Sequence, residues 1–390
     1  MLKFFLCHYL IVFQNYITDY NSIFSKFMSF EYLPELGTKI NDLDTPALVI
    51  DLDLVESNLS IMQNAANKMN INLRPHSKTH KSTYWAKKQI TLGAIGICCA
   101  KIGEAEIMSR SGVDNILIAN QIIGHSKIER LISIAKMSNV IVACDSEKNI
   151  RELSMASTLN SLTLGVLVEI NVGQNRCGID PAKSLEFAKL IDTLPGLTFK
   201  GIMGYEGHIV GEKDYEIRSK KARESMKFLQ DSVEIIKAGG LKCEIVSAAG
   251  TGTYSFSGSV KEVTELQCGS YIFMDGDYMN VMDDFDSALF LLTSVISNNV
   301  HNQIVVDCGL KSISVDRGLA NVITPNDAEI VKHSEEHTII STDGDLEIGD
   351  KVRLLPQHGD TTINLHDFYF GVRNGKLETI IPIDARGKFR

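Results

Sequence analysis

Short apolar runs alternate with longer amphipathic stretches from Ala47 to about Asp275, the pattern of βα units around a parallel sheet. The predicted strands of this part are Ile71–Arg74, Ala94–Cys99, Asn115–Ala119, Val140–Cys144, Gly165–Ile170, Gly201–Tyr205, Glu244–Ser247 and Ser270–Met274. Eight runs, each followed by room for a helix, favour a closed (β/α)8 barrel over an open doubly wound sheet. In such a barrel, chemistry is expected just after the carboxyl ends of the strands.

Beyond about Ala288 the pattern changes to short alternating strands separated by turn residues. The predicted strands here are Leu291–Ser297, Gln303–Asp307, His337–Ser341, Lys351–Leu355 and Phe368–Arg373. Two further dipeptides, Asp343-Gly344 and Asn374-Gly375, are typical hairpin turns. We therefore expect a barrel domain over residues 31–285 and an all-β C-terminal domain over residues 286–390. No long linker separates them, so we expect the two domains to pack closely, with a site between them.

The first 30 residues are expected to be an N-terminal extension, either poorly ordered or upstream of the true start. Phe4 to Phe13 is an apolar run after Lys3, but it is far shorter than the roughly 20 residues that span a bilayer. The stretch that follows has no small-x-small cleavage site, which argues against a secretion signal.

Composition and charge exclude several classes of partner. The net charge is −9 and no basic run is present, so a nucleic-acid partner is not expected. The eight cysteines form no CxxC pair and no small disulfide frame, which fits a reducing cytoplasm. We expect a cytoplasmic protein that acts on a small molecule, with no membrane partner.

A cluster of cations follows the first predicted barrel strand, in the string RPHSKTHK that contains Lys78. A lysine at a strand end inside a barrel can lose its water, which lowers its pKa and makes it an amine nucleophile towards an aldehyde. A solvated basic loop is the alternative reading of this string alone.

A second feature is the glycine-rich turn from Ser247 to Thr253, which offers backbone N–H groups and hydroxyls at the start of a helix. Gly269, Ser270 and Tyr271 add further donors. In a closed barrel the last strands flank the first, so this turn and Lys78 can face the same pocket. A tight connection between elements is the alternative.

The third feature is His358-Gly359-Asp360, in a predicted hairpin region of the β domain. In an extended segment, side chains at i and i+2 point to the same side, so His358 and Asp360 can share one ion. Imidazole and carboxylate suit Mn²⁺ or Mg²⁺, with Zn²⁺ as the alternative. A plain surface loop is the other reading.

Taken together, these strings resemble the D-threonine aldolase and D-serine dehydratase family, a pyridoxal-phosphate (PLP) family with an alanine racemase-like barrel and a β domain. The similarity runs from about Leu43 to Phe389 and includes, in order, LDTPALVIDLD, RPHSKTHK, VEINVGQNRCG, GIMGYEGH, AAGTGTY, TELQCGSYIFMD, DCGLKSISVD and PQHGDTTINLHD. Several ordered motifs over most of the chain carry the resemblance.

The resemblance implies a role for each candidate residue. Lys78 forms the Schiff base with PLP, Arg176 reaches the phenolic oxygen of the cofactor, and Tyr205 lies near its ring. His358 and Asp360 match the metal pair. The phosphate is expected on Gly250, Thr251, Gly252, Gly269, Ser270 and, as a further candidate, Tyr271.

Two positions depart from related proteins. Alanine racemases place an arginine against the pyridine nitrogen, whereas the corresponding strand here carries the neutral Gln267, a candidate contact. Some aldolases of the family have a histidine six residues after the tyrosine, where this chain has Gly211. His208 is the substitute that we predict as a catalytic residue, with a structural histidine as the alternative.

The predicted function is that of an aldolase, a carbon–carbon lyase that cleaves a D-β-hydroxy amino acid of the threonine or 3-hydroxyaspartate type to glycine and an aldehyde. Aldolases of the family carry His-x-Asp, as here, and dehydratases His-x-Cys. A D-serine or 3-hydroxyaspartate dehydratase, an amino-acid racemase and a non-catalytic PLP-binding protein remain as alternatives. The family precedent also implies a homodimer.

Overall fold

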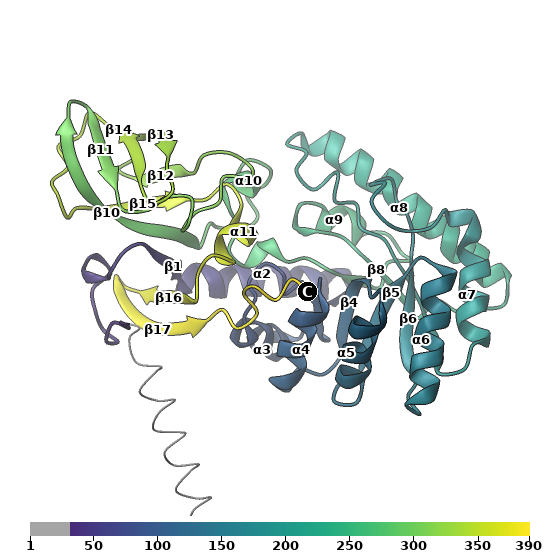
Figure 1. Cartoon of the computed structure of the whole chain (residues 1–390). Coiled ribbons are helices and arrows are strands. Elements are labelled where there is room, and N and C mark those ends of the chain that lie inside the picture. Colours follow the sequence, from purple (N-terminus) through teal and green to yellow (C-terminus); the bar gives the residue numbers. More distant parts are fainter. Residues whose placement is uncertain (1–31) are drawn as a thin grey trace, which may run out of the picture.

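The computed structural model describes residues 32–390, so the predicted N-terminal extension lies outside the described part of the chain. Within it, a (β/α)8 barrel is followed by a β-rich domain, as the sequence predicted (Figure 1). None of the helices in residues 32–390 is long and apolar enough to cross a lipid bilayer.

The barrel sheet contains eight parallel strands in the order β2-β9-β8-β7-β6-β5-β4-β3. These strands are β2 (Asn72–Leu73), β3 (Ile97–Cys99), β4 (Ile116–Gln121), β5 (Val140–Cys144), β6 (Leu164–Glu169), β7 (Leu197–Met203), β8 (Ile245–Ala248) and β9 (Glu265–Leu266). A parallel bridge between His76 and Cys98 joins the two ends of the sheet and closes the barrel.

The barrel helices lie outside the sheet (Figure 1). They are α2 (Leu52–Met69), α3 (Thr83–Leu92), α4 (Ile102–Arg110), α5 (His125–Ala135), α6 (Glu147–Leu159), α7 (Ser184–Thr193), α8 (Tyr215–Ala238) and the short α9 (Tyr254–Ser257) and α10 (Gly276–Met279). Side chains alternate along the strands, so one set packs on the helices and the other fills the barrel interior. The inner set forms a buried cluster that fills the barrel and includes Cys98, Leu117, Leu167 and Met203.

The second sheet has nine strands and includes the first strand of the described chain. Its strands are β1 (Ala47–Asp51), β10 (Leu289–Val300), β11 (Gln303–Val306), β12 (Asn321–Thr324), β13 (Glu329–His333), β14 (Thr338–Ser341), β15 (Lys351–Leu355), β16 (Phe368–Arg373) and β17 (Lys376–Pro382), with the five-residue helix α11 (Gly359–Ile363) after β15. β1 pairs antiparallel with β10 and parallel with β16 (Figure 1, purple beside yellow). The division at residue 285 stays a prediction, and the chain enters the second sheet before it enters the barrel.

Two predictions of local structure were wrong. Ser270–Met274 is a 3-10 turn (Ser270–Ile272) and bend instead of the last barrel strand, which is β9. Its apolar residues are buried against α2, where Asn58 donates to the Ile272 carbonyl, and a short buried run looks alike in a strand and in a turn. Asp343-Gly344 does not close a hairpin, because β14 pairs with β11 and β13, and β15 pairs with β10 and β12. Asn374-Gly375 does join the antiparallel pair β16 and β17.

Candidate active site

The cation cluster after β2 separates into two structural residues and one that is free for chemistry. Arg74 is buried and forms an ion pair with Glu265 on β9, with Nε 2.9 Å from Oε1. Lys81 lies 2.6 Å from Glu104 on α4. The ammonium nitrogen of Lys78 has no hydrogen-bond partner among the described residues and lies 5.8 Å from the centre of the Tyr205 ring. Of these three cations, Lys78 alone is left to react.

The pKa of Lys78 does not follow the expectation from the sequence. Burial acts to lower it, as expected, but the anionic forms of Tyr205, Asp360 and Cys98 outweigh burial, so the pKa is raised above its ordinary value. The prediction of a lowered pKa was therefore wrong for the protein without ligands. The pKa of Lys78 is raised because these three side chains lie near it, and a strand-end position in the sequence does not reveal them.

Lys78 lines a cavity of about 250 Å³ at the carboxyl ends of the barrel strands. The lining also includes Arg176, Tyr205, Gln267, Gly250, Thr251, Gly269 and Ser270, so the structure brings most of the predicted cofactor residues together. The guanidinium of Arg176 lies 5.7 Å from the centre of the Tyr205 ring. Lys78 and Arg176 thus both lie close to the same aromatic ring.

The glycine-rich turn after β8 packs against Tyr205, which lines the cavity. A Cβ on Gly250 would stand 3.0 Å from Cε2 of Tyr205, and a Cβ on Gly269 would stand 2.9 Å from Oγ1 of Thr79. The Oγ1 of Thr251 accepts a hydrogen bond from the backbone N–H of Tyr271, which ties the two predicted phosphate loops together. Gly250, Thr251, Gly269 and Ser270 all line the cavity.

Gly252 and Tyr271 do not line the cavity. A Cβ on Gly252 would stand 2.1 Å from the carbonyl oxygen of Val210, so this glycine is required by packing of the loop. The Tyr271 side chain is buried, and its hydroxyl accepts a hydrogen bond from Gln89. Of this residue, only the backbone N–H takes part in the phosphate loops.

Gln267 belongs to a buried polar chain below the cavity. Its Nε2 donates to the hydroxyl of Ser247 at 2.7 Å, and that hydroxyl donates to Glu265, the partner of Arg74. Its Oε1 accepts from the thiol of Cys98 at 3.4 Å. These bonds fix the amide and leave a neutral polar group on the floor of the cavity.

His208 is exposed and is not among the residues that line the cavity. Its ring lies beside Gly173, whose added Cβ would stand 3.3 Å from Nε2. The structure therefore gives no contact between His208 and the cavity, and its catalytic role stays a prediction from the sequence.

The predicted metal pair occupies the junction between β15 and α11. His358 is extended, but the helix begins at Gly359, so the premise of an extended segment was wrong for Asp360. Separate contacts hold the ring of His358 and the backbone that leads to Asp360. Nδ1 of His358 lies 2.7 Å from Oδ2 of Asp316, and the Gly359 N–H donates to Oδ2 of Asp275 at 2.9 Å.

Electrostatics also suit a cation here. Partial burial acts to raise the pKa of Asp316, but hydrogen bonds from Ser314, His358 and Thr361 lower it to about 2, so Asp316 is anionic and holds the Nδ1–H of His358. Nε2 of His358 is then the free ligand atom. Oδ1 of Asp360 is buried without a hydrogen-bond partner within residues 32–390. A buried carboxylate oxygen without a partner and an imidazole nitrogen two residues earlier are donor types that suit a divalent ion.

Sequence reasoning missed several residues of this region. Tyr278 lines the cavity, and burial raises its pKa, with Tyr205, Asp275 and Asp360 as further causes. Asp275 and Asp316 support the metal pair. The strings MDGDYMN and SISVD contain these residues, but nothing in their local pattern shows that they meet across the two sheets.

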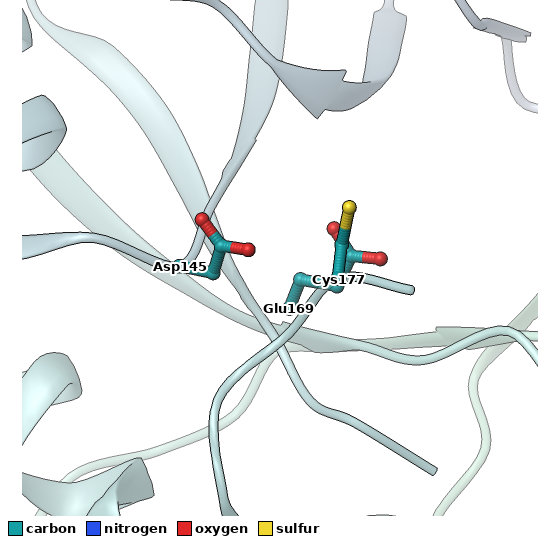
Figure 2. A group of neighbouring side chains, drawn as sticks. All are labelled: Asp145, Glu169 and Cys177. Carbon is teal, nitrogen blue, oxygen red and sulfur yellow. The ribbon is translucent and has the colours of Figure 1, made fainter. Parts of the chain in front are cut away.

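A further group follows the ends of β5 and β6 (Figure 2). Asp145, Glu169 and Cys177 each offer a ligand atom within 4.8 Å of the others. Part of this group is already engaged, because Gln121 donates to Glu169 at 2.5 Å and the Gly178 N–H donates to Asp145 at 3.0 Å. Glu169 and Cys177 line the cavity beside Arg176, so the group surrounds that arginine with acidic side chains.

Comparison with known proteins agrees with this arrangement. A family model described as "Alanine racemase, N-terminal domain" matches residues 50–277, and one described as "Putative serine dehydratase domain" matches residues 288–372. A 3-hydroxy-D-aspartate aldolase of Paracoccus denitrificans (strain Pd 1222) is 40% identical, covering 90% of this chain and 94% of its own length.

A solved structure of D-threonine aldolase from Filomicrobium marinum matches with a TM-score of 0.88 and 37% identity, covering 91% of this chain and 99% of that one. A D-threo-3-hydroxyaspartate dehydratase of Delftia sp. is 27% identical, covering 82% of this chain and 92% of its own length. The match to the first domain extends over more than half of the chain, and the relatives cover nearly all of it. The chain therefore belongs to the D-threonine aldolase and D-serine dehydratase family, whose barrel is the alanine racemase N-terminal domain.

Proposed function

We propose that the protein is a PLP- and divalent-metal-dependent lyase that cleaves D-β-hydroxy amino acids of the 3-hydroxyaspartate or threonine type to glycine and an aldehyde. One observation carries the proposal. Within residues 32–390, the amine of Lys78 has no hydrogen-bond partner and lines a cavity together with Gly250 and Gly269, and the buried Oδ1 of Asp360, two residues after His358, has no partner either.

The residues present fit PLP. Lys78 would hold its aldehyde carbon, and Gly250, Thr251, Gly269 and Ser270, which line the same cavity, would hold its phosphate through backbone N–H groups and hydroxyls. Arg176 and Tyr205 would flank the ring. Bound PLP supplies an electron sink for the pair of electrons left at Cα when a bond to that carbon breaks.

The metal pair also fits its group. His358 through Nε2 and Asp360 through Oδ1 would hold a hard or borderline divalent ion, for which we propose Mn²⁺ or Mg²⁺. A bound ion lowers the pKa of a hydroxyl that coordinates it. Asp316 keeps His358 in the tautomer that frees Nε2, and Asp275 fixes the backbone between the two ligands.

The protein's own residues then determine which bond breaks. Overall, the substrate loses the proton of its β-hydroxyl, the Cα–Cβ bond breaks, and Cα gains a proton, which gives glycine and the aldehyde. Lys78 lines the cavity, and its amine would supply the proton that Cα gains. Gln267 presents a neutral amide to the same cavity.

The carboxylate of Asp360 favours the aldolase over the dehydratase, because it selects a harder ion than the thiolate of the dehydratase pair would. The chain is also more similar in sequence to the aldolases above than to the dehydratase of Delftia sp.. The homodimer and the cytoplasmic location stay predictions.

The test gives the PLP- and Mn²⁺-loaded protein D-threonine and D-3-hydroxyaspartate, and assays glycine and aldehyde against ammonia and keto acid. We expect glycine, with loss of product on adding a chelator or on changing His358→Ala. Lys78→Ala should abolish both product and the borohydride-trapped cofactor, whereas Lys189→Ala, an exposed lysine on α7, should change neither. Ammonia as the main product would make the protein a dehydratase, and full activity in chelator would remove the metal from the proposal.

A further inference from the structure

The metal pair and the cavity define where the group on Cβ of the substrate must lie. If the β-hydroxyl binds at His358 and Asp360, the other group on Cβ lies close to the residues that support this pair, which come from the segment 312–318 and the start of α10. This step rests on the proposed function. The contacts that frame this space are the bonds from His358 to Asp316 and from the Gly359 N–H to Asp275.

That space is strongly acidic. The carboxylates of Asp275 and Asp316 lie next to the pair, Asp360 of the pair adds a third, and Asp277 follows on α10, where its backbone N–H donates to the Gln357 carbonyl. One divalent ion offsets only part of this charge. A methyl group, as in threonine, is not affected by the field, but a second carboxylate is repelled unless a cation meets it.

Arg317 is placed to be that cation. It follows Asp316, the partner of His358, and its Nη1 lies 2.7 Å from Oδ2 of Asp277. No other guanidinium nitrogen of Arg317 has a hydrogen-bond partner in residues 32–390, and 45% of the side chain is exposed. The edge formed by Nε and Nη2 is therefore free, with the fork geometry that binds a carboxylate through two hydrogen bonds.

Its surroundings also favour the positively charged form of Arg317. Burial acts to lower the pKa of Arg317, but Asp277, and after it Asp275 and Tyr278, raise it. Arg317 does not line the cavity itself, but its partner Asp277 directly precedes Tyr278, which does.

The cations that line the cavity itself are otherwise engaged. Lys78 and Arg176 are the proposed cofactor residues, and burial lowers the pKa of His76 well below its ordinary value, which keeps that ring neutral. We infer that Arg317 binds the β-carboxylate of a diacid substrate, and that it sets a preference for 3-hydroxyaspartate-type over threonine-type substrates.

The first experiment compares kcat/KM of the PLP- and Mn²⁺-loaded wild type and Arg317→Gln for D-3-hydroxyaspartate and D-threonine. Loss of a hydrogen-bonded ion pair predicts a fall of about 10- to 100-fold for the diacid, mainly through KM, and a change within about threefold for D-threonine. Arg317→Lys keeps the charge without the fork and should lie between. Arg151→Gln, which breaks an exposed pair with Glu147 on α6, is the matched control and should change neither substrate.

The second experiment measures binding without turnover, in chelator, by calorimetry. D-aspartate and D-2-aminobutyrate lack the β-hydroxyl and cannot be cleaved, and they differ in the second carboxylate. Arg317→Gln should weaken D-aspartate by about 10-fold or more and leave D-2-aminobutyrate unchanged.

The outcomes separate this inference from the proposed function. Equal losses for both substrates, no loss for the diacid, or a wild type that cleaves D-threonine and not the diacid would overturn the role of Arg317. A wild type that releases glycine from neither substrate would overturn the aldolase. In that case, unchanged D-aspartate binding in Arg317→Gln would still refute the carboxylate contact, and selective weakening would support it.

Discussion

His80 should make the folded protein sensitive to acid, and the structure sets the size of the effect. The ring is fully buried two residues after Lys78, and its Nδ1 accepts the backbone N–H of Ser82. Burial lowers the pKa of His80 from its ordinary value of 6.5 to about 4, against smaller opposing contributions from Gln89 and Asp360. The folded protein therefore keeps this histidine neutral where an unfolded chain takes up a proton.

The sign of the pH dependence of stability follows from the lowered pKa of His80. Above pH 6.5 both states are neutral at His80 and stability is complete, and stability is lost as the pH falls towards 4. With these two pKa values, the loss between pH 7.5 and pH 5 is about 2 kcal/mol. His333 and His366 also have pKa values lowered by burial, so the wild type loses more than this one contribution.

The assay is urea unfolding followed by circular dichroism at pH 7.5 and pH 5, for the wild type and His80→Gln. The variant can lose stability at both pH values because the core is altered, so the readout is the difference between the two pH values. That difference should shrink by about 2 kcal/mol in His80→Gln. It should stay unchanged in His125→Gln, an exposed control on α5. An equal pH dependence in His80→Gln and the wild type would refute the reasoning.

Two further predictions concern the cofactor and the metal. Gly250→Val places side-chain carbon where Tyr205 Cε2 lies 3.0 Å away, so PLP occupancy measured by visible absorbance should fall several-fold; full occupancy would place the phosphate elsewhere. Asp316→Asn removes the anionic partner of His358 and should weaken Mn²⁺ binding by about 10- to 100-fold in a competition titration, with PLP occupancy retained. Unchanged metal affinity would exclude His358 as a supported ligand.

The architecture was predictable because its signals are local. Val140–Cys144 and Phe368–Arg373 were predicted with the bounds that the structure shows, since a buried strand and an alternating strand each carry their own hydrophobic pattern. Ser270–Met274 failed because burial alone produced the apolar run. The strand β1 was not assigned to the second sheet, because pairing between Ala47 and Leu292 spans most of the chain and leaves no local trace.

The residues of the candidate site likewise divide into those that local signals predicted and those that only long-range contacts reveal. Lys78, Arg176 and Tyr205 come from separate loops, and a barrel brings the ends of its strands together, so their meeting followed from the fold class. The contact of Asp275 with Gly359 crosses from one domain to the other, and the contact of Asp316 with His358 joins segments 42 residues apart, so periodicity within a single segment could not indicate them. The packing role of Gly252 could not be foreseen for a related reason, since the carbonyl of Val210 that excludes a side chain there belongs to a distant loop, and its phosphate role stays a prediction.

The two halves of the site depend on one set of contacts between the domains. On the barrel side, the hydroxyl of Tyr369 donates to the His80 carbonyl at 2.6 Å, and the Ala385 N–H donates to the Lys81 carbonyl at 2.8 Å, so β-domain residues hold the loop that carries Lys78. On the other side, Asp275 of the barrel holds the Gly359 N–H of the metal loop. Each domain thus fixes the reactive segment of the other. A shift between the domains would therefore move Lys78 and the predicted metal pair relative to one another.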